Sequence, residues 1–183
     1  LEELNVSDDY IKKYIDKLED MGHTFIAYKK DSDINRQIER IKDADVLMLA
    51  NMPLDRRVVE NASKLKYIDV AFTGVDHIPV SYAKTRGINI SNASDYATDA
   101  VSELCISFKI ELLRNIKENE ESLRNGGTKE GFVGNLLRGK TVGIIGAGKI
   151  GRRVAYLCKV FGCRVIVYNR SIVKEEFIDE QVE

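Results

Sequence analysis

The chain has few of the residues that build metal sites and disulfide frameworks. It contains two histidines, His23 and His77, which lie far apart in the sequence and argue against a zinc site. Its three cysteines, Cys105, Cys158 and Cys163, are odd in number and show no metal or redox spacing. Such usage is typical of reduced thiols inside a cell. We therefore expect no metal ligands and a cytoplasmic protein.

Long apolar runs and an excess of one charge are also missing. No stretch of about 18 apolar residues is present, and the first residues do not form a signal-peptide pattern. The net charge of −1 creates no field that would attract nucleic acid or an anionic membrane. The 183 residues, 44% of them hydrophobic, are ordinary for a soluble protein of one large or two small domains. We expect a small-molecule ligand, and neither nucleic acid nor a membrane as a partner.

A glycine-rich loop stands out against this background. An apolar, β-branched run over residues 141–145 enters the loop, and a helical pattern leaves it. The loop has the spacing G-x-G-x-x-G, with Gly146, Ala147, Gly148, Lys149, Ile150 and Gly151. The first glycine permits a sharp turn, the second a close approach of a diphosphate, and the third tight packing of helix on strand. The amino end of the helix adds free N–H groups and a positive dipole end. The pattern predicts a dinucleotide site.

A second predicted strand, residues 164–168, indicates which dinucleotide is bound. Asn169 follows it, where a dinucleotide-binding unit places the group that meets the adenosine ribose. An NAD site usually has a carboxylate there, which would repel a 2′-phosphate. Asn169 is neutral, and Arg170 with Ser171 could bind that phosphate. We predict NADP as the preferred cofactor, with NAD as the alternative. A βαβ unit that binds no nucleotide is the structural alternative.

The first half of the chain alternates between helical and strand patterns. Helices are expected over residues 7–22, 34–41 and 58–62, and a further short helix is expected to end at residue 85. Strands are expected over residues 24–28, 45–50, 66–72 and 88–91. An α/β domain usually opens with a strand, so we expect the first strand to precede Leu1. Alternation of this kind predicts an α/β fold with parallel sheets covered by helices on both faces.

Two further features divide the chain. The polar turn from Thr73 to His77 follows the strand 66–72, and ligands of open α/β sheets bind beyond such carboxyl ends. An ordinary strand-to-helix loop is the alternative reading of that turn. The run 92–95 interrupts the alternation and marks a domain boundary. A long helix is expected from Tyr96, and it continues through the charged stretch 116–124. One side of this helix is apolar and carries Ala97, Val101, Leu104, Cys105, Phe108 and Leu112.

Three segments in this order resemble a known family, the D-isomer-specific 2-hydroxyacid dehydrogenases. They are Gly-Val-Asp-His-Ile at 74–78, the run 87–96 with Ala-Val-Ser-Glu at 100–103, and the run 137–151 around the glycine loop. The resemblance implies a flavodoxin-like substrate-binding domain over residues 1–93. It also implies the first part of a Rossmann NAD(P)-binding domain over 94–183, with cofactor and substrate in the cleft between the domains.

The resemblance also implies roles for particular residues. Backbone N–H groups of Thr73, Gly74 and Val75 would bind the substrate carboxylate, and Tyr96 would line the substrate side. Thr98 would lie near the nicotinamide half of the cofactor. Residues 147–150 would hold the diphosphate through backbone groups. Family members are usually dimers, so a homodimer is expected.

The family's chemistry is a reversible hydride transfer between the nicotinamide and a 2-oxo or 2-hydroxy acid. It uses an Arg, a Glu and a His that follow the glycine loop at a distance. We expect these residues beyond Glu183, so the resemblance implies no catalytic residue in this chain and an inactive piece of a longer enzyme. Two alternatives remain open: an NAD(P)-sensing or corepressor-like binding protein on the same fold, and another Rossmann enzyme such as formate dehydrogenase.

Overall fold

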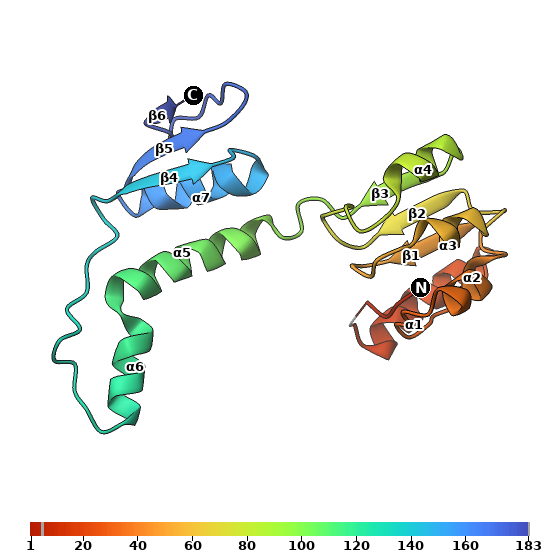
Figure 1. The fold of residues 1–183 in the computed structure, drawn as a ribbon, viewed down its shortest axis with the longest axis horizontal. Helices are drawn as coiled ribbons and strands as arrows, with labels where there is room; N and C mark the ends of the chain where they lie inside the picture. The colour runs from red at the N-terminus through yellow and green to blue at the C-terminus, as the bar shows by residue number, and fades with distance from the viewer. Residues whose placement is uncertain (5, 183) are drawn as a thin grey trace. The chain divides into compact units, whose positions relative to one another are not determined.

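The computed structural model describes residues 1–4 and 6–182 (Figure 1). The chain forms two compact units, Leu1–Ser94 and Asp95–Glu183. Each unit contains one parallel three-stranded sheet together with helices, so the predicted α/β fold with parallel sheets is confirmed. Over the described part of the chain, no helix is both long and apolar enough to cross a membrane.

The first unit alternates between helices and strands, as predicted. Its helices are α1 (Asp8–Asp20), α2 (Ile34–Ile41), α3 (Arg56–Glu60) and α4 (Val80–Thr85). Its strands are β1 (Val46–Leu49), β2 (Tyr67–Val70) and β3 (Asn89–Asn92), hydrogen-bonded in the order β1-β2-β3. All pairs are parallel, so the carboxyl ends of the three strands lie at one edge of the sheet.

Short polar side chains fix where the helices of this unit begin. Ser7 caps α1, and the carboxylates of Asp33 and Asp55 accept hydrogen bonds from the first backbone N–H groups of α2 and α3. Gly22, with φ of +82°, follows the end of α1 in the left-handed conformation that glycine adopts without strain. These caps explain why the helical patterns start and stop where the sequence predicts.

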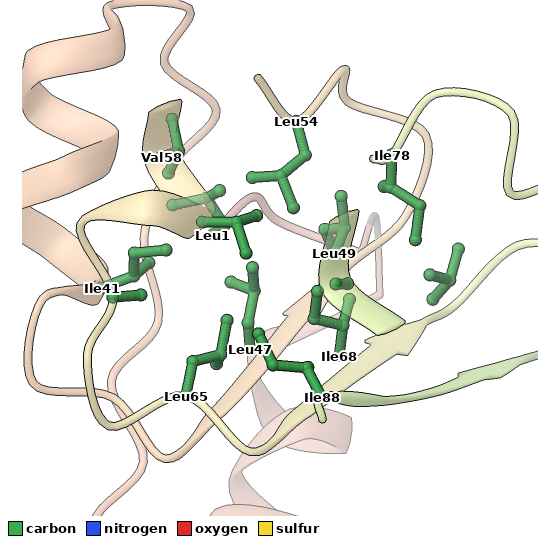
Figure 2. Close-up of a cluster of buried hydrophobic side chains, with 14 of the residues drawn as sticks. Leu1, Ile41, Leu47, Leu49, Leu54, Val58, Leu65, Ile68, Ile78 and Ile88 are labelled. Carbon is green, nitrogen blue, oxygen red and sulfur yellow. The ribbon is translucent and has the colours of Figure 1, made fainter. Parts of the chain in front are cut away.

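Apolar side chains from the strands and from α2 and α3 form the core of the first unit (Figure 2). Leu49, Ile68, Val58 and Val70 have no exposed surface. Leu1 joins this cluster, and its amino group donates to the backbone oxygen of Met48 at 2.8 Å. The first residue therefore lies beside β1.

One predicted strand, residues 24–28, is wrong. The segment is not assigned to any sheet, and none of the backbone-to-backbone hydrogen bonds among the described residues involves it. Ile26 is 60% exposed. The residue types favour an extended backbone, but a strand also needs a neighbour with which to share hydrogen bonds.

The second unit has two helices followed by a sheet with a third helix. The helices are α5 (Thr98–Arg114), α6 (Ile116–Arg124) and α7 (Lys149–Val160). The strands are β4 (Thr141–Ile145), β5 (Arg164–Tyr168) and β6 (Glu180–Val182), parallel and in the order β4-β5-β6. The patterns over 141–145 and 164–168 predicted β4 and β5. Three-residue β6 was missed because a segment so short shows no periodicity.

The core of the second unit lies between α5, α7 and the sheet. Val154, Ala155 and Cys158 of α7 are buried against Val165 and Val167 of β5. Burial is also the main reason that the pKa of the Cys158 thiol is raised. Cys158 is therefore a packing residue, as its place in a helical pattern indicates.

The long helix predicted from Tyr96 to residue 124 is two helices. Asn115 separates α5 from α6 and has the left-handed backbone angles φ 50° and ψ 43°. Asparagine tolerates this conformation better than other residues with a side chain, so it permits a sharp change of direction between two helical patterns. The residues buried on α5 are Ser102 and Ile106, whereas Leu104, Phe108 and Leu112 are 51%, 52% and 79% exposed. The predicted apolar side of the helix is therefore largely outside the core of its unit.

The stability of the β5–β6 pair is expected to depend on pH through Asp179. Its carboxylate accepts from the backbone N–H of Val165 at 2.7 Å and from Lys159 Nζ at 2.5 Å, and the bond with Lys159 is the main reason its pKa is lowered. A lowered pKa contributes stability that is present above the ordinary value of 3.8 and is lost as the pH falls through the lowered pKa.

Asp179→Asn should therefore lower the melting temperature at pH 7. The difference in melting temperature between this variant and the unchanged chain should become smaller as the pH falls into the acid range. Thermal melts at a series of pH values measure this difference, and a difference that stays constant below pH 3 would contradict the assignment.

Candidate functional site

The glycine loop joins β4 to α7 through a tight turn. Gly146 has φ of +92°, and its N–H donates to the backbone oxygen of Tyr168 at 2.8 Å. Ala147 is buried, and its carbonyl accepts from Arg152 Nε at 2.9 Å. The turn is therefore held from both sides, by the end of β5 and by the first turn of α7.

Two glycines of the loop are needed for different reasons. A Cβ at Gly151 would lie 2.0 Å from the carbonyl oxygen of Gly146, closer than any side chain can approach. Gly151 therefore lets α7 start directly against the turn. A Cβ at Gly148 would meet no described protein atom within 4 Å, and Gly148 has an ordinary φ of −71°. The structure itself does not require glycine at this position, and the absence of a side chain leaves the backbone open to a ligand.

Backbone N–H groups at the start of α7 have no partner within the described residues. The amides of Gly148, Lys149, Ile150 and Gly151 donate to none of them. Such groups at a helix amino end carry partial positive charge and bind anions. The loop therefore offers four donors beside the open position at Gly148.

Side chains at the start of α7 tie it to the start of α5. Lys149 Nζ lies 2.5 Å from a carboxylate oxygen of Asp95, and Arg153 Nε lies 2.8 Å from one of Asp99. The Lys149 side chain is thus engaged with the protein, so only its backbone N–H is offered to a ligand. Two predicted site residues belong to the same short stretch: Tyr96, which is 62% exposed, and half-buried Thr98 at the beginning of α5.

Asn169 has a role that the sequence did not indicate. Its side-chain oxygen accepts from the N–H of Ala147 at 3.1 Å, and its side-chain nitrogen donates to the carbonyl and hydroxyl oxygens of Ser171 at 3.0 and 3.1 Å. The amide is therefore hydrogen-bonded through both its oxygen and its nitrogen. Asn169 therefore holds the glycine loop and its own loop in place.

The side chain of Arg170 is exposed, and no carboxylate among the described residues pairs with it.

A third residue of this region, Gln181 of β6, was missed by sequence reasoning. Its side-chain amide makes three hydrogen bonds to the loop 169–173. Only the parallel pairing of β6 with β5 brings it there, so no local sequence signal could have found it.

In the first unit, the predicted carboxylate-binding turn follows β2. The backbone N–H groups of Thr73, Gly74 and Val75 donate to no described residue. The turn is nevertheless fixed, because Asn92 donates to the carbonyl of Thr73 at 2.6 Å and the Thr73 hydroxyl donates to Ala93 at 3.3 Å. Three consecutive free N–H groups on a fixed turn form a suitable site for a carboxylate.

His77 lies next to this turn but serves packing. Its ring lies edge-on to Phe72 at 6.4 Å between centroids, and its carbonyl accepts from the N–H of Leu54 at 2.9 Å. Its Nε2 is buried and has no hydrogen-bond partner within the described part of the chain. Over the same residues, no cluster of histidines, cysteines and carboxylates could hold a metal ion.

Comparison with known proteins identifies the class to which these features belong. The family model for the catalytic domain of D-isomer specific 2-hydroxyacid dehydrogenases matches residues 4–148. The chain belongs to this family, as the three resembling segments predicted. The match includes the turn at Thr73 and the glycine loop as far as Gly148.

Individual relatives agree with this assignment. The chain is 38% identical over 172 residues to D-3-phosphoglycerate dehydrogenase of Methanocaldococcus jannaschii, covering 93% of this chain and 32% of the relative. It is 34% identical over 143 residues to glyoxylate reductase of Thermococcus litoralis, covering 73% of this chain and 43% of the relative. The chain thus spans less than half the length of these two relatives.

Solved structures show the same similarity in three dimensions. An acyclic imino acid reductase in complex with NADPH and D-Arg superimposes with a TM-score of 0.86 at 26% identity, covering all of this chain and 58% of that one. The NAD⁺-bound 3-phosphoglycerate dehydrogenase of Entamoeba histolytica gives 0.74 at 30% identity, covering 97% of this chain and 53% of that one.

The two glycines should respond differently to substitution. Gly151→Ala should destabilise the second unit by at least about 3 kcal/mol, because its methyl group would overlap the carbonyl of Gly146. Gly148→Ser should change stability by less than about 1 kcal/mol, because serine is a favourable residue at a helix N-cap and its Cβ meets no protein atom. Denaturant unfolding of both variants measures the contrast, and equal losses would contradict this account of the loop.

Proposed function

We propose that the protein is the cofactor- and substrate-binding part of an NAD(P)-dependent 2-hydroxyacid dehydrogenase. The observation that carries this proposal is the glycine loop of a chain of this family, where open Gly148 and the next three residues have N–H groups without a partner among the described residues. The second unit would hold the dinucleotide, and the first would hold the carboxylate of a 2-oxo or 2-hydroxy acid.

The residues of the loop fit a dinucleotide diphosphate. The open backbone at Gly148 permits close approach, and the N–H groups of Gly148, Lys149, Ile150 and Gly151 can donate to phosphate oxygens. The dipole of α7 adds favourable potential for a negative charge. For Ala147 we propose a role in fixing the turn, since its N–H donates to the side-chain oxygen of Asn169.

The substrate would be recognised through its carboxylate. The free N–H groups of Thr73, Gly74 and Val75 would donate to its oxygens, and Tyr96 would line the substrate side. Thr98 would lie near the nicotinamide. When bound, the nicotinamide cofactor supplies the hydride that a 2-oxo acid accepts at its C2 carbon. We assign no residue of this chain to proton transfer.

We propose NADP as the preferred cofactor, with NAD as the alternative. Arg170 is exposed and unpaired among the described residues, and Ser171 beside it adds a hydroxyl. No carboxylate stands at position 169 to repel a 2′-phosphate. Structures of similar proteins contain either cofactor: the imino acid reductase is bound to NADPH and the Entamoeba histolytica dehydrogenase to NAD⁺.

We also propose that the protein forms a homodimer. Leu104, Phe108 and Leu112 recur every four residues on one stripe of α5 and are each more than half exposed. On α6, Leu123 is 61% exposed. Exposed apolar surface of this kind favours association with another protein surface.

A cytoplasmic location of the protein stays a prediction, based on the three free cysteines of the chain.

Calorimetric titration with NADPH and with NADH tests the proposed function and its cofactor preference. The unchanged chain should bind both dinucleotides, and NADPH more tightly. Arg170→Ala should weaken NADPH binding by about 1 to 3 kcal/mol and leave NADH binding nearly unchanged, because only NADPH carries the 2′-phosphate.

A matched control is Lys174→Ala, which removes another exposed positive charge from the same connection between β5 and β6. This variant should bind both dinucleotides like the unchanged chain. A folded chain that binds neither dinucleotide would overturn the proposed function. Equal losses for NADPH and NADH in Arg170→Ala would overturn the preference alone.

The homodimer is tested by a charge placed on the apolar stripe of α5. Leu112→Glu should shift the protein to monomer, because a carboxylate buried at an apolar interface has no partner. Ser107→Glu adds the same charge to α5 outside the stripe and should leave the dimer intact. Sedimentation velocity at matched concentrations measures both, and a monomeric unchanged chain would refute the proposal.

A further inference from the structure

Gln181 connects the third strand of the nucleotide unit to the loop that would read the cofactor. It lies on β6, opposite Val167 of β5, and its side chain is half-buried. Its Nε2 donates to the carbonyl oxygens of Asn169 at 3.2 Å and Ser171 at 3.0 Å. Its Oε1 accepts from the N–H of Val173 at 2.9 Å. The amide thus contacts the beginning, middle and end of the loop 169–173.

The orientation of this amide is fixed by its partners. The opposite orientation would place Oε1 against two carbonyl oxygens and Nε2 against an N–H group, so every contact would be repulsive. Neither a carboxylate nor an aliphatic side chain can donate two hydrogen bonds and accept one in this arrangement. The loop therefore depends on the particular chemistry of glutamine.

The same network reaches the diphosphate-binding loop through Asn169. The carbonyl of Asn169 accepts from Gln181, and its side-chain oxygen accepts from the N–H of Ala147 in the glycine loop. Asn169 also donates to both oxygen atoms of Ser171, one of which is the carbonyl held by Gln181. A continuous chain of hydrogen bonds thus joins β6, the loop after β5 and the turn after β4.

Arg170 lies inside this network but makes none of its side-chain contacts. Its two neighbours, Asn169 and Ser171, are both held through their carbonyls, so the backbone that carries Arg170 is fixed while its guanidinium remains exposed. A long flexible side chain pays less entropy on binding an anion when its backbone is already positioned.

We infer that Gln181 is a positioning residue that sets the preference for NADPH by holding the loop that carries Arg170 and Ser171. This inference rests on the proposed function, since it assumes a dinucleotide on the glycine loop and a 2′-phosphate at Arg170. Gln181 itself touches neither the cofactor nor the reacting atoms in this role. It acts through the backbone of its neighbours.

A purely structural role would predict a different behaviour. The strand β6 has its own ladder to β5, and Asp179 at its start pairs with Val165 and Lys159. Loss of the Gln181 amide therefore leaves β6 in the sheet and releases only the loop. Loss of the Gln181 amide should therefore change the cofactor preference without a matching loss of stability.

The test uses Gln181→Met, which keeps the length of the side chain and removes all three hydrogen bonds. The dissociation constant for NADPH should rise about tenfold and that for NADH less than about threefold, because the loop contributes mainly to binding of the 2′-phosphate. Without any nucleotide, the backbone N–H of Val173 should exchange its hydrogen faster, since it loses its acceptor.

Glu180→Gln is the matched control. It changes the adjacent residue of β6 and removes the exposed ion pair with Arg164, and the Glu180 side chain has no hydrogen bond to the loop 169–173 among the described residues. This variant should keep both the preference for NADPH and the slow exchange at Val173. A thermal melt verifies that each variant is folded.

A double variant separates positioning from a general effect. If Gln181 acts through Arg170, then adding Gln181→Met to Arg170→Ala should cause less than about a threefold further loss of NADPH binding. Independent, additive losses would overturn the inference, as would an unchanged preference in folded Gln181→Met.

Failure of the proposed function is distinguishable from failure of this inference. An unchanged chain that binds neither dinucleotide overturns both the function and the specificity role. An unchanged chain that prefers NADPH, with a Gln181→Met variant that prefers it equally, overturns the role of Gln181 alone.

Discussion

The close approach of α7 to the turn at Gly146 is the constraint on which the second unit depends. The helix can begin there only because Gly151 has no side chain, since a Cβ would lie 2.0 Å from the carbonyl of Gly146. The approach places the N–H groups of the first turn, which have no partner among the described residues, beside the open backbone at Gly148. It also lets Val154, Ala155 and Cys158 fill the core against β5. One contact between backbone atoms thus sets both the packing of the helix and the donors that it offers.

Both units leave backbone N–H groups unpaired within the described residues in the same way. In a parallel sheet, the last residues of each strand lead into turns whose backbone is not used by the ladder. The turn after β2 leaves three N–H groups unpaired, and the loop after β4 leaves four, counted over the described residues. In each case nearby side chains hold the turn, Asn92 in one and Asn169 in the other. Recognition of an anion by fixed backbone groups depends on such support, because the donors must keep their geometry without the ligand.

Much of this organisation could be predicted from the sequence, and the failures have physical causes. Periodicity predicted α2, β2 and β5 because each buries one side in its own unit. The segment 24–28 has the residues of a strand but no hydrogen-bonded neighbour among the described residues, and pairing is not a local property. The break at Asn115 was missed because the helical pattern continues on both sides of it.

The sequence by itself determined the α/β alternation, the position of the glycine loop and the membership of a dehydrogenase family, because each of these depends on residue types at fixed local spacing. Only the tertiary structure decided what Asn169 does. Its spacing from the glycine loop predicts a partner for the ribose, and the pairing of β5 with β4 and β6 additionally brings its amide to Ala147 and its carbonyl to Gln181. Hydrogen bonds between strands join residues distant in the chain, so no local pattern specifies them.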